Sequence, residues 1–258
     1  MNNDFLPPDS QTPAVDRRQL LRGVGLAGAG AALAGSLTPT QLAAAARATQ
    51  VGAGAPAGLQ PLLTRIGAPS AVLGRVCTLT PQQTEGPYYL NNRLTRQDIT
   101  EGRPGLELWL FYLVVHADCS PAAGAVVDVW HAEALGVYSG FSQQGTAGQT
   151  WMRGGQTTDG NGLVAFRTLY PGWYPGRATH VHVKVHLQNS TVLTTQTYFD
   201  DPLTTLVYDN IAPYTQRGSA GRTLNTRDGI YDARNQKVIH LNPAGGLSLW
   251  AGMIIGIA

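Results

Sequence analysis

The sequence predicts an all-β fold, a sandwich or barrel built from many short strands. The chain of 258 residues contains 31 Gly and 16 Pro, which interrupt regular structure often. From residue 77 onward, apolar segments are short and bounded by turn residues, which is typical of strands. No segment shows the apolar period of a helix longer than about three turns. A chain of this length also buries a sizeable core without additional staples.

The strands are expected where short apolar segments lie between turn signals. The segments are Leu106 to His116, Gly124 to Trp130, Gly162 to Leu169, His180 to Leu187 and Val192 to Phe199. The sequence TDGNG at 158–162 is a dense turn signal, so it should connect or open strands. The C-terminal run, 247–258, is only 12 residues long. It is too short to cross a bilayer as a helix and predicts a buried final strand.

The N-terminal part of the chain differs from this strand-rich body. Arg17 and Arg18 precede an uncharged stretch at 23–46, which is typical of a cleaved twin-arginine export signal. The glycines in this stretch make it only weakly apolar, which disfavours a membrane anchor. We therefore predict a signal at 1–47, a Gly/Ala/Pro-rich arm or linker at 48–75 and a functional β domain at 76–258. We expect a periplasmic or extracellular protein with no stable membrane span after cleavage.

Charge and cysteine content restrict the partners. Eighteen Lys and Arg stand against 16 Asp and Glu without any basic run, so the electrostatic footprint of a nucleic-acid-binding protein is missing. The two cysteines, Cys77 and Cys119, are too few for a disulfide scaffold and too far apart for a zinc ribbon. They permit one disulfide in an oxidising compartment.

The segment 180–186 (HVHVKVH) alternates polar and apolar residues. In a strand this alternation places the histidines and Lys184 on one face and the valines on the other. Imidazoles two residues apart stand roughly 7 Å apart and point the same way, which suits two ligands of one metal ion. His180 and His182 are therefore candidate ligands, while His186, about 13 Å beyond His182, should be structural or at the surface. A solvated polar face is the alternative.

Four motifs follow one another along the chain. They are TPQQTEGPYY at 80–89, WHAEALGVYSG at 130–140, PGWY with RATHVH at 171–182, and TTQ at 194–196. Together they resemble the intradiol ring-cleavage dioxygenases, the family of catechol and protocatechuate dioxygenases, and most closely its small exported members. The resemblance spans about 76–200. It implies an antiparallel β-sandwich with long active-site loops and little helix.

The resemblance also implies a metal centre. In that family a non-haem ferric ion, one per chain, is held by two tyrosinates and two histidines, which by motif are Tyr138, Tyr174, His180 and His182. Phenolate is a hard anionic donor that favours Fe(III) over Fe(II). By the same correspondence Tyr174 accepts a diol proton, Arg177 stabilises negative charge on the ring, and Gln196 is the polar neighbour of Arg177.

The substrate implied by the resemblance is a catechol-type diol, which reacts with O2 and opens between its hydroxyl-bearing carbons to a muconate-type diacid. Gly86, Pro87 and Tyr88 resemble the segment that lines the ring pocket in protocatechuate enzymes. Trp130 and Trp173 are candidate aromatic walls, with core packing as the alternative. The sequence leaves the ring substituents and the oligomeric state open.

The second cysteine also matches the exported members, so a Cys77–Cys119 disulfide is expected, with two buried thiols as the alternative. Two other functions compete with ring cleavage. An exported sandwich without iron would bind an aromatic ligand or a carbohydrate, but the intact tyrosine and histidine set argues against it. A zinc hydrolase would need a third ligand such as His186 or Asp200, and the strand spacing disfavours His186.

Overall fold

The structure is a computed structural model that describes residues 78–92, 94–241 and 247–258. The predicted signal, the arm and Cys77 lie outside the described residues. The strands are β1 Glu107–His116, β2 Val126–Trp130, β3 Arg153–Thr157, β4 Leu163–Leu169, β5 His180–Leu187, β6 Ser190–Tyr198, β7 Val238–Leu241 and β8 Ser248–Ile257. The helix α4 spans Asp201–Asn210, and short 3-10 turns lie at η2 Ser142–Gln144, η3 Tyr214–Gln216, η4 Asn225–Arg227 and η5 Ala233–Asn235.

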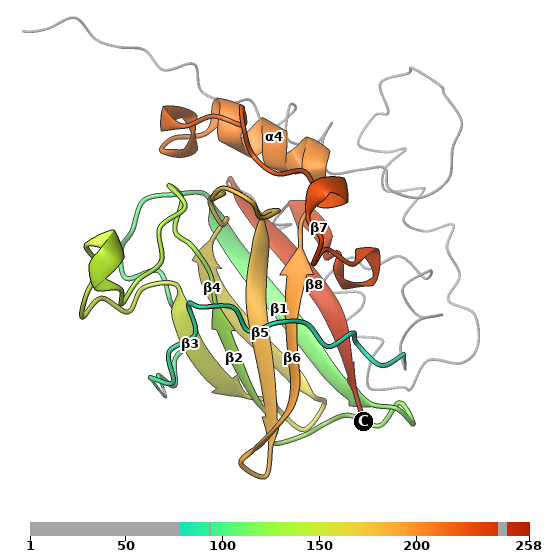
Figure 1. Cartoon of the computed structure of the whole chain (residues 1–258). Coiled ribbons are helices and arrows are strands. Elements are labelled where there is room, and N and C mark those ends of the chain that lie inside the picture. Colours follow the sequence, from blue (N-terminus) through green and yellow to red (C-terminus); the bar gives the residue numbers. More distant parts are fainter. Residues whose placement is uncertain (1–77, 93, 242–246) are drawn as a thin grey trace, which may run out of the picture.

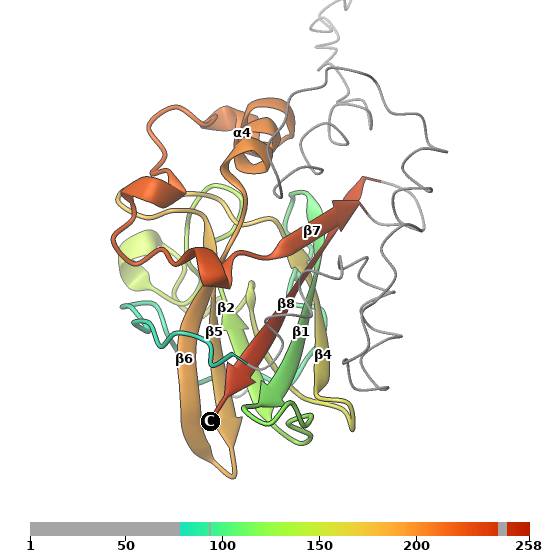
Figure 2. The ribbon, with the colours of Figure 1, turned by 90° about the vertical axis from the view of Figure 1, so that its right-hand side faces the viewer.

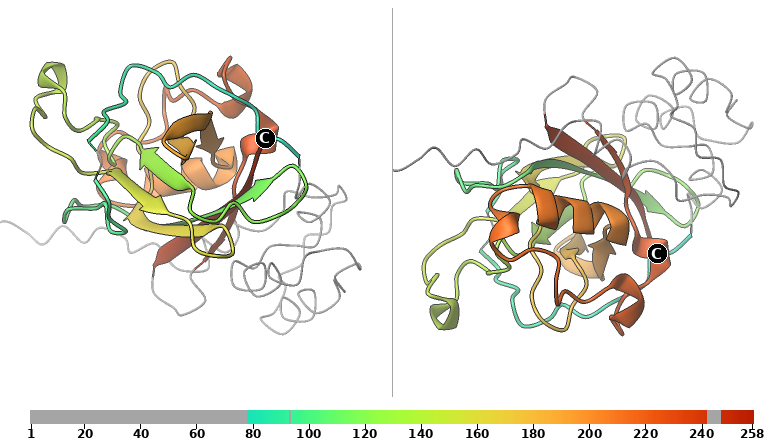
Figure 3. Two further views of the ribbon diagram at one scale, coloured as in Figure 1. Left: turned by 90° about the horizontal axis from the view of Figure 1, so that it is seen from below. Right: turned by 90° about the horizontal axis from the view of Figure 1, so that it is seen from above.

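The strands form two sheets of four, in the orders β4-β1-β8-β7 and β3-β2-β5-β6. The two sheets pack as the layers of a sandwich (Figures 1 and 2), and α4 covers one open end of it (Figure 3). No helix in the described part of the chain is long and apolar enough to cross a bilayer. The predicted β-sandwich with little helix is thereby confirmed.

The predicted strands match the observed ones closely. β5 has the predicted bounds, the other four predicted segments begin within two residues of a strand, and the C-terminal run forms β8. β3 and β7 were not predicted, because RGGQT contains no apolar alternation and β7 has only four residues. The expected antiparallel pairing is wrong for one pair, because β8 runs parallel to β1. The chain crosses the end of the sandwich through α4 before β7, and such long connections permit parallel pairing, whereas tight turns do not.

The core lies between the sheets and is built by alternation along the strands. On β1, Leu108, Leu110 and Tyr112 are fully buried, and on β5 the three valines of the predicted apolar face are fully buried too. The opposite face of β5 is also buried, with His180 3% and His182 1% exposed. The alternative of a solvated polar face is therefore wrong.

A segment from the start of the described chain covers this polar face. Residues 78–92 pass in front of β6, β5 and β2 (Figure 1, teal). The Gln83 N–H donates to the carbonyl of Thr194 at 2.8 Å, and the Thr195 hydroxyl donates to the carbonyl of Pro81 at 2.8 Å. The polar side chains of β5 thus lie between a sheet and a covering loop, where they are shielded from bulk water.

Candidate metal centre

The four predicted ligands come from three segments and gather at the start of β5. His180 and His182 lie on β5, Tyr138 lies in the loop after β2, and Tyr174 lies in the loop between β4 and β5. The Tyr174 hydroxyl is 3.2 Å from Nε2 of His180, which is 3.1 Å from Nε2 of His182. The Tyr138 ring centroid is 5.6 Å from that of Tyr174 and 6.1 Å from that of His182.

Backbone and stacking contacts orient the two imidazoles. Nδ1 of His180 lies 2.6 Å from the carbonyl of Ala178. A ring nitrogen must donate to reach a carbonyl, so Nε2 of His180 carries the lone pair. The His182 ring lies flat on the Trp130 indole, with centroids 4.8 Å apart and planes 4° apart. Burial, followed by the positive charge of Arg177, lowers the pKa of His180 to about 3, so its imidazole is neutral at pH 7.

The hydroxyl group of the buried Tyr138 side chain lacks a hydrogen-bond partner in the described part of the protein. Tyr138 is 1% exposed, and its hydroxyl has no hydrogen-bond partner among the described residues. Burial, followed by the neighbouring Tyr174, raises the pKa of Tyr138 well above its usual value. Such an unsatisfied buried group in a folded protein requires an explanation. A cation bound among the four donors would supply one, because it ionises and binds the phenol.

The donor set fits a ferric ion better than zinc. Two donors at about 2.0–2.1 Å from one ion lie about 3 Å apart, which agrees with the separations of 3.1 and 3.2 Å. Among the described residues, no three His, Cys, Asp or Glu side chains form a group that could hold a metal. A third donor beside the imidazoles is therefore a phenol, and hard anionic oxygen suits Fe(III).

The two residues that could supply the third ligand of a zinc hydrolase, His186 and Asp200, contact other groups instead. His186 Nε2 is 3.1 Å from a carboxylate oxygen of Asp128. Asp200 caps α4, since its carboxylate accepts a hydrogen bond from the backbone N–H of Leu203 at 3.3 Å. The zinc-hydrolase alternative has no support in this arrangement.

Arg177 and Gln196 are brought together beside the histidines. Gln196 is fully buried on β6 and pairs in register with His182. A terminal guanidinium N–H of Arg177 donates to the side-chain oxygen of Gln196, and Nε of Arg177 donates to Asp228 at 3.1 Å. The Gln196 amide in turn donates to the carbonyl of Thr84 at 2.9 Å. The guanidinium is thus held at two points.

The predicted pocket residues 86–88 pass over the ligands. Gly86 has a φ of +72°, and a Cβ atom there would lie 3.5 Å from the His182 ring. The Tyr88 ring stacks on Tyr138, with centroids 4.2 Å apart and planes 13° apart, and meets Tyr174 edge-on at 6.1 Å. Pro87 connects these two contacts. The GPY sequence therefore covers the metal donors from the side of the N-terminal segment.

The two predicted aromatic walls have different positions. Trp130 is 1% exposed and stacks behind His182, so it supports a ligand. Trp173 packs against the main core, its indole N–H donates to the carbonyl of Gly218 at 2.8 Å, and the Arg217 guanidinium lies 3.9 Å from its ring. These contacts correspond to the alternative of core packing for Trp173.

Sequence reasoning missed a buried arginine beneath this site. Arg153, at the start of β3, donates from Nε to the Ser139 hydroxyl at 2.9 Å and from its two terminal nitrogens to the carbonyls of Ser139 at 2.8 Å and Tyr88 at 2.7 Å. Burial lowers its pKa to about 10, so it stays cationic at pH 7. Arg153 ties the Tyr88 segment to the Tyr138 loop. No sequence motif marks it, because its partners lie 65 and 14 residues away.

The second missed residue is Asp228, whose carboxylate is 1% exposed and pairs with Arg177. It belongs to none of the four motifs. Of the predicted cysteine pair, Cys119 is disulfide-bonded, while Cys77 lies outside the described residues.

Comparisons with known proteins agree with this geometry. A family described as Dioxygenase matches residues 82–229. Catechol 1,2-dioxygenase 1 of Acinetobacter lwoffii is 31% identical over 157 residues, which cover 52% of this chain and 50% of that protein. Catechol 1,2-dioxygenase of Acinetobacter baylyi is 31% identical over 178 residues, 60% of this chain and 56% of that protein. The chain thus spans about half the length of the curated relatives it matches.

Solved structures are also similar. An intradiol ring-cleavage dioxygenase from Tetranychus urticae superposes with a TM-score of 0.65 at 30% identity, covering 70% of this chain and 95% of that one. The dioxygenase domain of a dioxygenase carbohydrate-binding protein fusion from Streptomyces sp. SirexAA-E superposes with a TM-score of 0.54 at 28% identity, covering 69% and 97%.

Proposed function

The chain belongs to the intradiol ring-cleavage dioxygenases, and we propose that it cleaves a catechol-type diol between its two hydroxyl-bearing carbons. Both atoms of O2 enter the product, a muconate-type diacid. One observation carries the proposal, which is the convergence of two buried imidazoles with two phenols, one of whose hydroxyls has no hydrogen-bond partner in the described protein.

This family depends on non-haem iron, and the donor set described above fits it. We propose one Fe(III) per chain, held by Tyr138, Tyr174, His180 and His182. When bound, the ferric ion ionises the phenols and the diol and draws electron density from the ring, which prepares a ring carbon to react with O2.

The two tyrosines differ in access to substrate. Tyr138 is 1% exposed beneath Tyr88, whereas Tyr174 is only half-buried at the end of its loop. The Tyr174 oxygen, which would be ionised with iron bound, is therefore the atom that would accept a diol proton, as a general base within reach of the substrate. Tyr138 is the permanent ligand in this account.

Arg177 supplies fixed positive charge to the reacting ring. Its guanidinium is anchored by Asp228 and Gln196, so it cannot swing away as negative charge develops on the substrate. A charge placed in advance lowers the barrier because no reorganisation is needed at the moment of reaction. The covering segment 84–88 limits the access of water to the same space.

We propose that the ring of the substrate is uncharged. Among the described residues, four cations on or near this side of the sandwich already have partners: Arg177 pairs with Asp228, Arg153 with neutral oxygens, Lys184 with Glu85, and the buried Lys237 lies 3.8 Å from the Phe199 ring. A ring carboxylate would have to displace one of these contacts, whereas catechol would not. The curated relatives bear the names of catechol and chlorocatechol dioxygenases, which supports the same choice.

Two experiments test the function. Reaction with catechol under dioxygen labelled with heavy oxygen should give a ring-opened diacid that carries both labels. A product opened beside the hydroxyl-bearing carbons, or no consumption of catechol by the iron-loaded protein, would contradict the proposal.

For the substrate class, kcat/KM should be higher with catechol than with protocatechuate. E85Q should lower the ratio of these two kcat/KM values several-fold, because it releases Lys184 to pair with a ring carboxylate. A wild-type preference for protocatechuate would refute the choice of ring.

We also propose that the chain is exported by the twin-arginine route. The pair Arg17 and Arg18 before an uncharged stretch supports it, and the disulfide at Cys119 suits an oxidising compartment. Replacing both arginines by lysine should retain the protein in the cytoplasm. Unchanged export of that variant would refute the route.

A further inference from the structure

The carboxylate of Asp228 binds two groups that belong to the metal centre. It is 1% exposed. One oxygen, Oδ2, accepts a hydrogen bond from Nε of Arg177 at 3.1 Å and another from the backbone N–H of Ala178 at 2.8 Å. The other oxygen, Oδ1, accepts from the N–H of Ile230 at 2.9 Å. Both oxygens are therefore held, and the carboxylate cannot turn freely.

The first consequence concerns a metal ligand. The N–H of Ala178 donates to Asp228, and the carbonyl of the same residue accepts the Nδ1 proton of His180 at 2.6 Å. Asp228 thus fixes the backbone that sets the tautomer and the direction of the His180 ring. Groups that hold a ligating imidazole from behind are worth about 10- to 100-fold in metal affinity or activity.

The second consequence concerns the arginine. Its Nε is held by Asp228, and its terminal nitrogen donates to Gln196. A charged hydrogen bond at each end fixes the plane of the guanidinium, and losing one of them leaves a long side chain with several rotamers.

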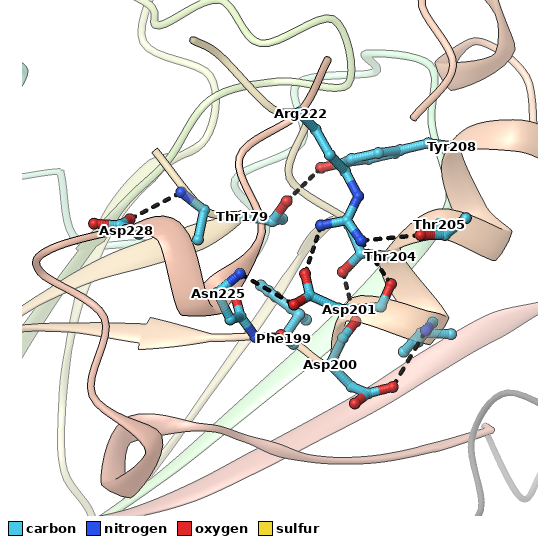
Figure 4. A network of polar contacts seen from close by, with 12 residues as sticks. Thr179, Phe199, Asp200, Asp201, Thr204, Thr205, Tyr208, Arg222, Asn225 and Asp228 are labelled. Carbon is cyan, nitrogen blue, oxygen red and sulfur yellow. Dashed lines mark hydrogen bonds and ion pairs between the residues drawn. The ribbon is translucent and has the colours of Figure 1, made fainter. Parts of the chain in front are cut away.

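Asp228 reaches this position because its segment is fastened to the start of α4 (Figure 4). Asp201 accepts from Arg222 at 2.5 Å and from the N–H of Asn225 at 3.0 Å, and the Asn225 amide donates to the carbonyl of Phe199 at 2.7 Å. Three residues after Asn225 the chain presents Asp228 to the start of β5. Asp201, which anchors the segment, and Asp228, which contacts the metal centre, are thus separate carboxylates of one network.

We propose that Asp228 is a positioning residue for ring cleavage, which holds Arg177 and, through the Ala178 backbone, His180 in one arrangement. This inference rests on the proposed function. It assigns the role to a carboxylate outside the four sequence motifs, and it predicts that one substitution changes both turnover and iron retention.

The experiment compares D228N with D201N in iron-loaded protein. Both substitutions remove a carboxylate that pairs with an arginine and accepts a backbone N–H, but only Asp228 touches the site. D228N should lower kcat about 10- to 100-fold with little change in KM, hasten iron loss to a chelator by a similar factor, and shift the visible charge-transfer band. D201N should lower the thermal midpoint and leave kcat, iron loss and the band near wild type, because the bond from the Asn225 amide to the Phe199 carbonyl still fastens the segment.

A double-mutant cycle separates the two routes. R177Q should slow turnover without hastening iron loss, and D228N added to R177Q should hasten iron loss while lowering kcat less than it does alone. If D228N does not fold, D228E serves in its place, because it keeps the charge and shifts the carboxylate by one methylene.

D228N or D228E that matches D201N in all three readouts, beside an active wild type, overturns this inference alone. If the effects of R177Q and D228N on kcat are fully additive in the double variant, Asp228 does not act on turnover through Arg177. A wild type that neither binds iron nor cleaves catechol overturns the proposed function together with it.

Discussion

At Gly172 the two tyrosine-bearing loops are in close backbone contact, so G172A tests how far the centre depends on their separation. A Cβ atom on Gly172 would lie 2.3 Å from the carbonyl oxygen of Ala134 and 2.5 Å from that of Glu133. Gly172 stands two residues before Tyr174, and Ala134 stands four residues before Tyr138. The clashing atoms are backbone atoms, so no side chain can move aside to make room.

The size of the effect follows from the distance. An ordinary contact begins at 3.4 Å, so the loops must separate by about 1 Å. Overpacking of this kind costs about 1–3 kcal/mol of stability. A displacement of about 1 Å at a reacting centre costs about 100-fold in rate. G172A should therefore fold with a lower free energy of unfolding, retain iron poorly and lose about 100-fold in kcat.

The assay measures urea unfolding, iron content and kcat for G172A beside G160A. Gly160 is exposed and has open space where a Cβ atom would stand, so G160A should match wild type in all three. A G172A protein with wild-type iron content and kcat would show that the spacing of the loops does not set the metal centre.

Three further predictions follow from single side chains. H180A should lose iron, measured as metal per chain, while H186A should keep it, because His186 bonds Asp128 and lies outside the donor set; full iron and activity in H180A would overturn the ligand assignment. R153K should lower the free energy of unfolding by about 2–4 kcal/mol, because the ammonium can replace only part of three hydrogen bonds from a charged group, and urea unfolding with no change would refute that role. Burial lowers the pKa of His131 to about 4, so between about pH 6.5 and 4 the unfolded chain binds a proton that the folded chain does not. The contribution of neutral His131 to the free energy of unfolding is complete above about pH 6.5 and falls by on the order of 3 kcal/mol as the pH drops to about 4. Urea unfolding of wild type and H131Q across this range should show a smaller fall of the free energy of unfolding in H131Q.

The sequence carried the information for β5 and its two candidate ligands because that information is local. Alternating His and Val fixed both the strand and its two faces, and the motif supplied the two tyrosines. β3 could not be predicted in the same way, because distant residues leave no room for a side chain at its two glycines. A Cβ on Gly154 would meet Ile99 at 2.6 Å, and one on Gly155 would meet Asp128 at 2.4 Å.

The rest of the site depends on contacts between distant parts of the chain. Asp228 meets Arg177 across 51 residues, and neither local sequence shows the pairing. Trp173 adjoins a proposed ligand in sequence, yet its ring packs against Arg217, 44 residues away. The parallel pairing of β1 and β8 likewise becomes visible only when the whole chain has folded. Local pattern therefore predicted the four candidate ligands, while tertiary packing determines what holds them.

The central claim is that Tyr138, Tyr174, His180 and His182 form one ferric tyrosinate centre that binds a catechol directly. The visible absorption spectrum of the purified protein, recorded without oxygen before and after adding catechol, tests it most directly. We predict a coloured protein whose tyrosinate-to-iron band moves to longer wavelength when catechol is added. A protein that stays colourless after reconstitution with ferric ion would contradict the claim and favour a sandwich that binds its ligand without iron.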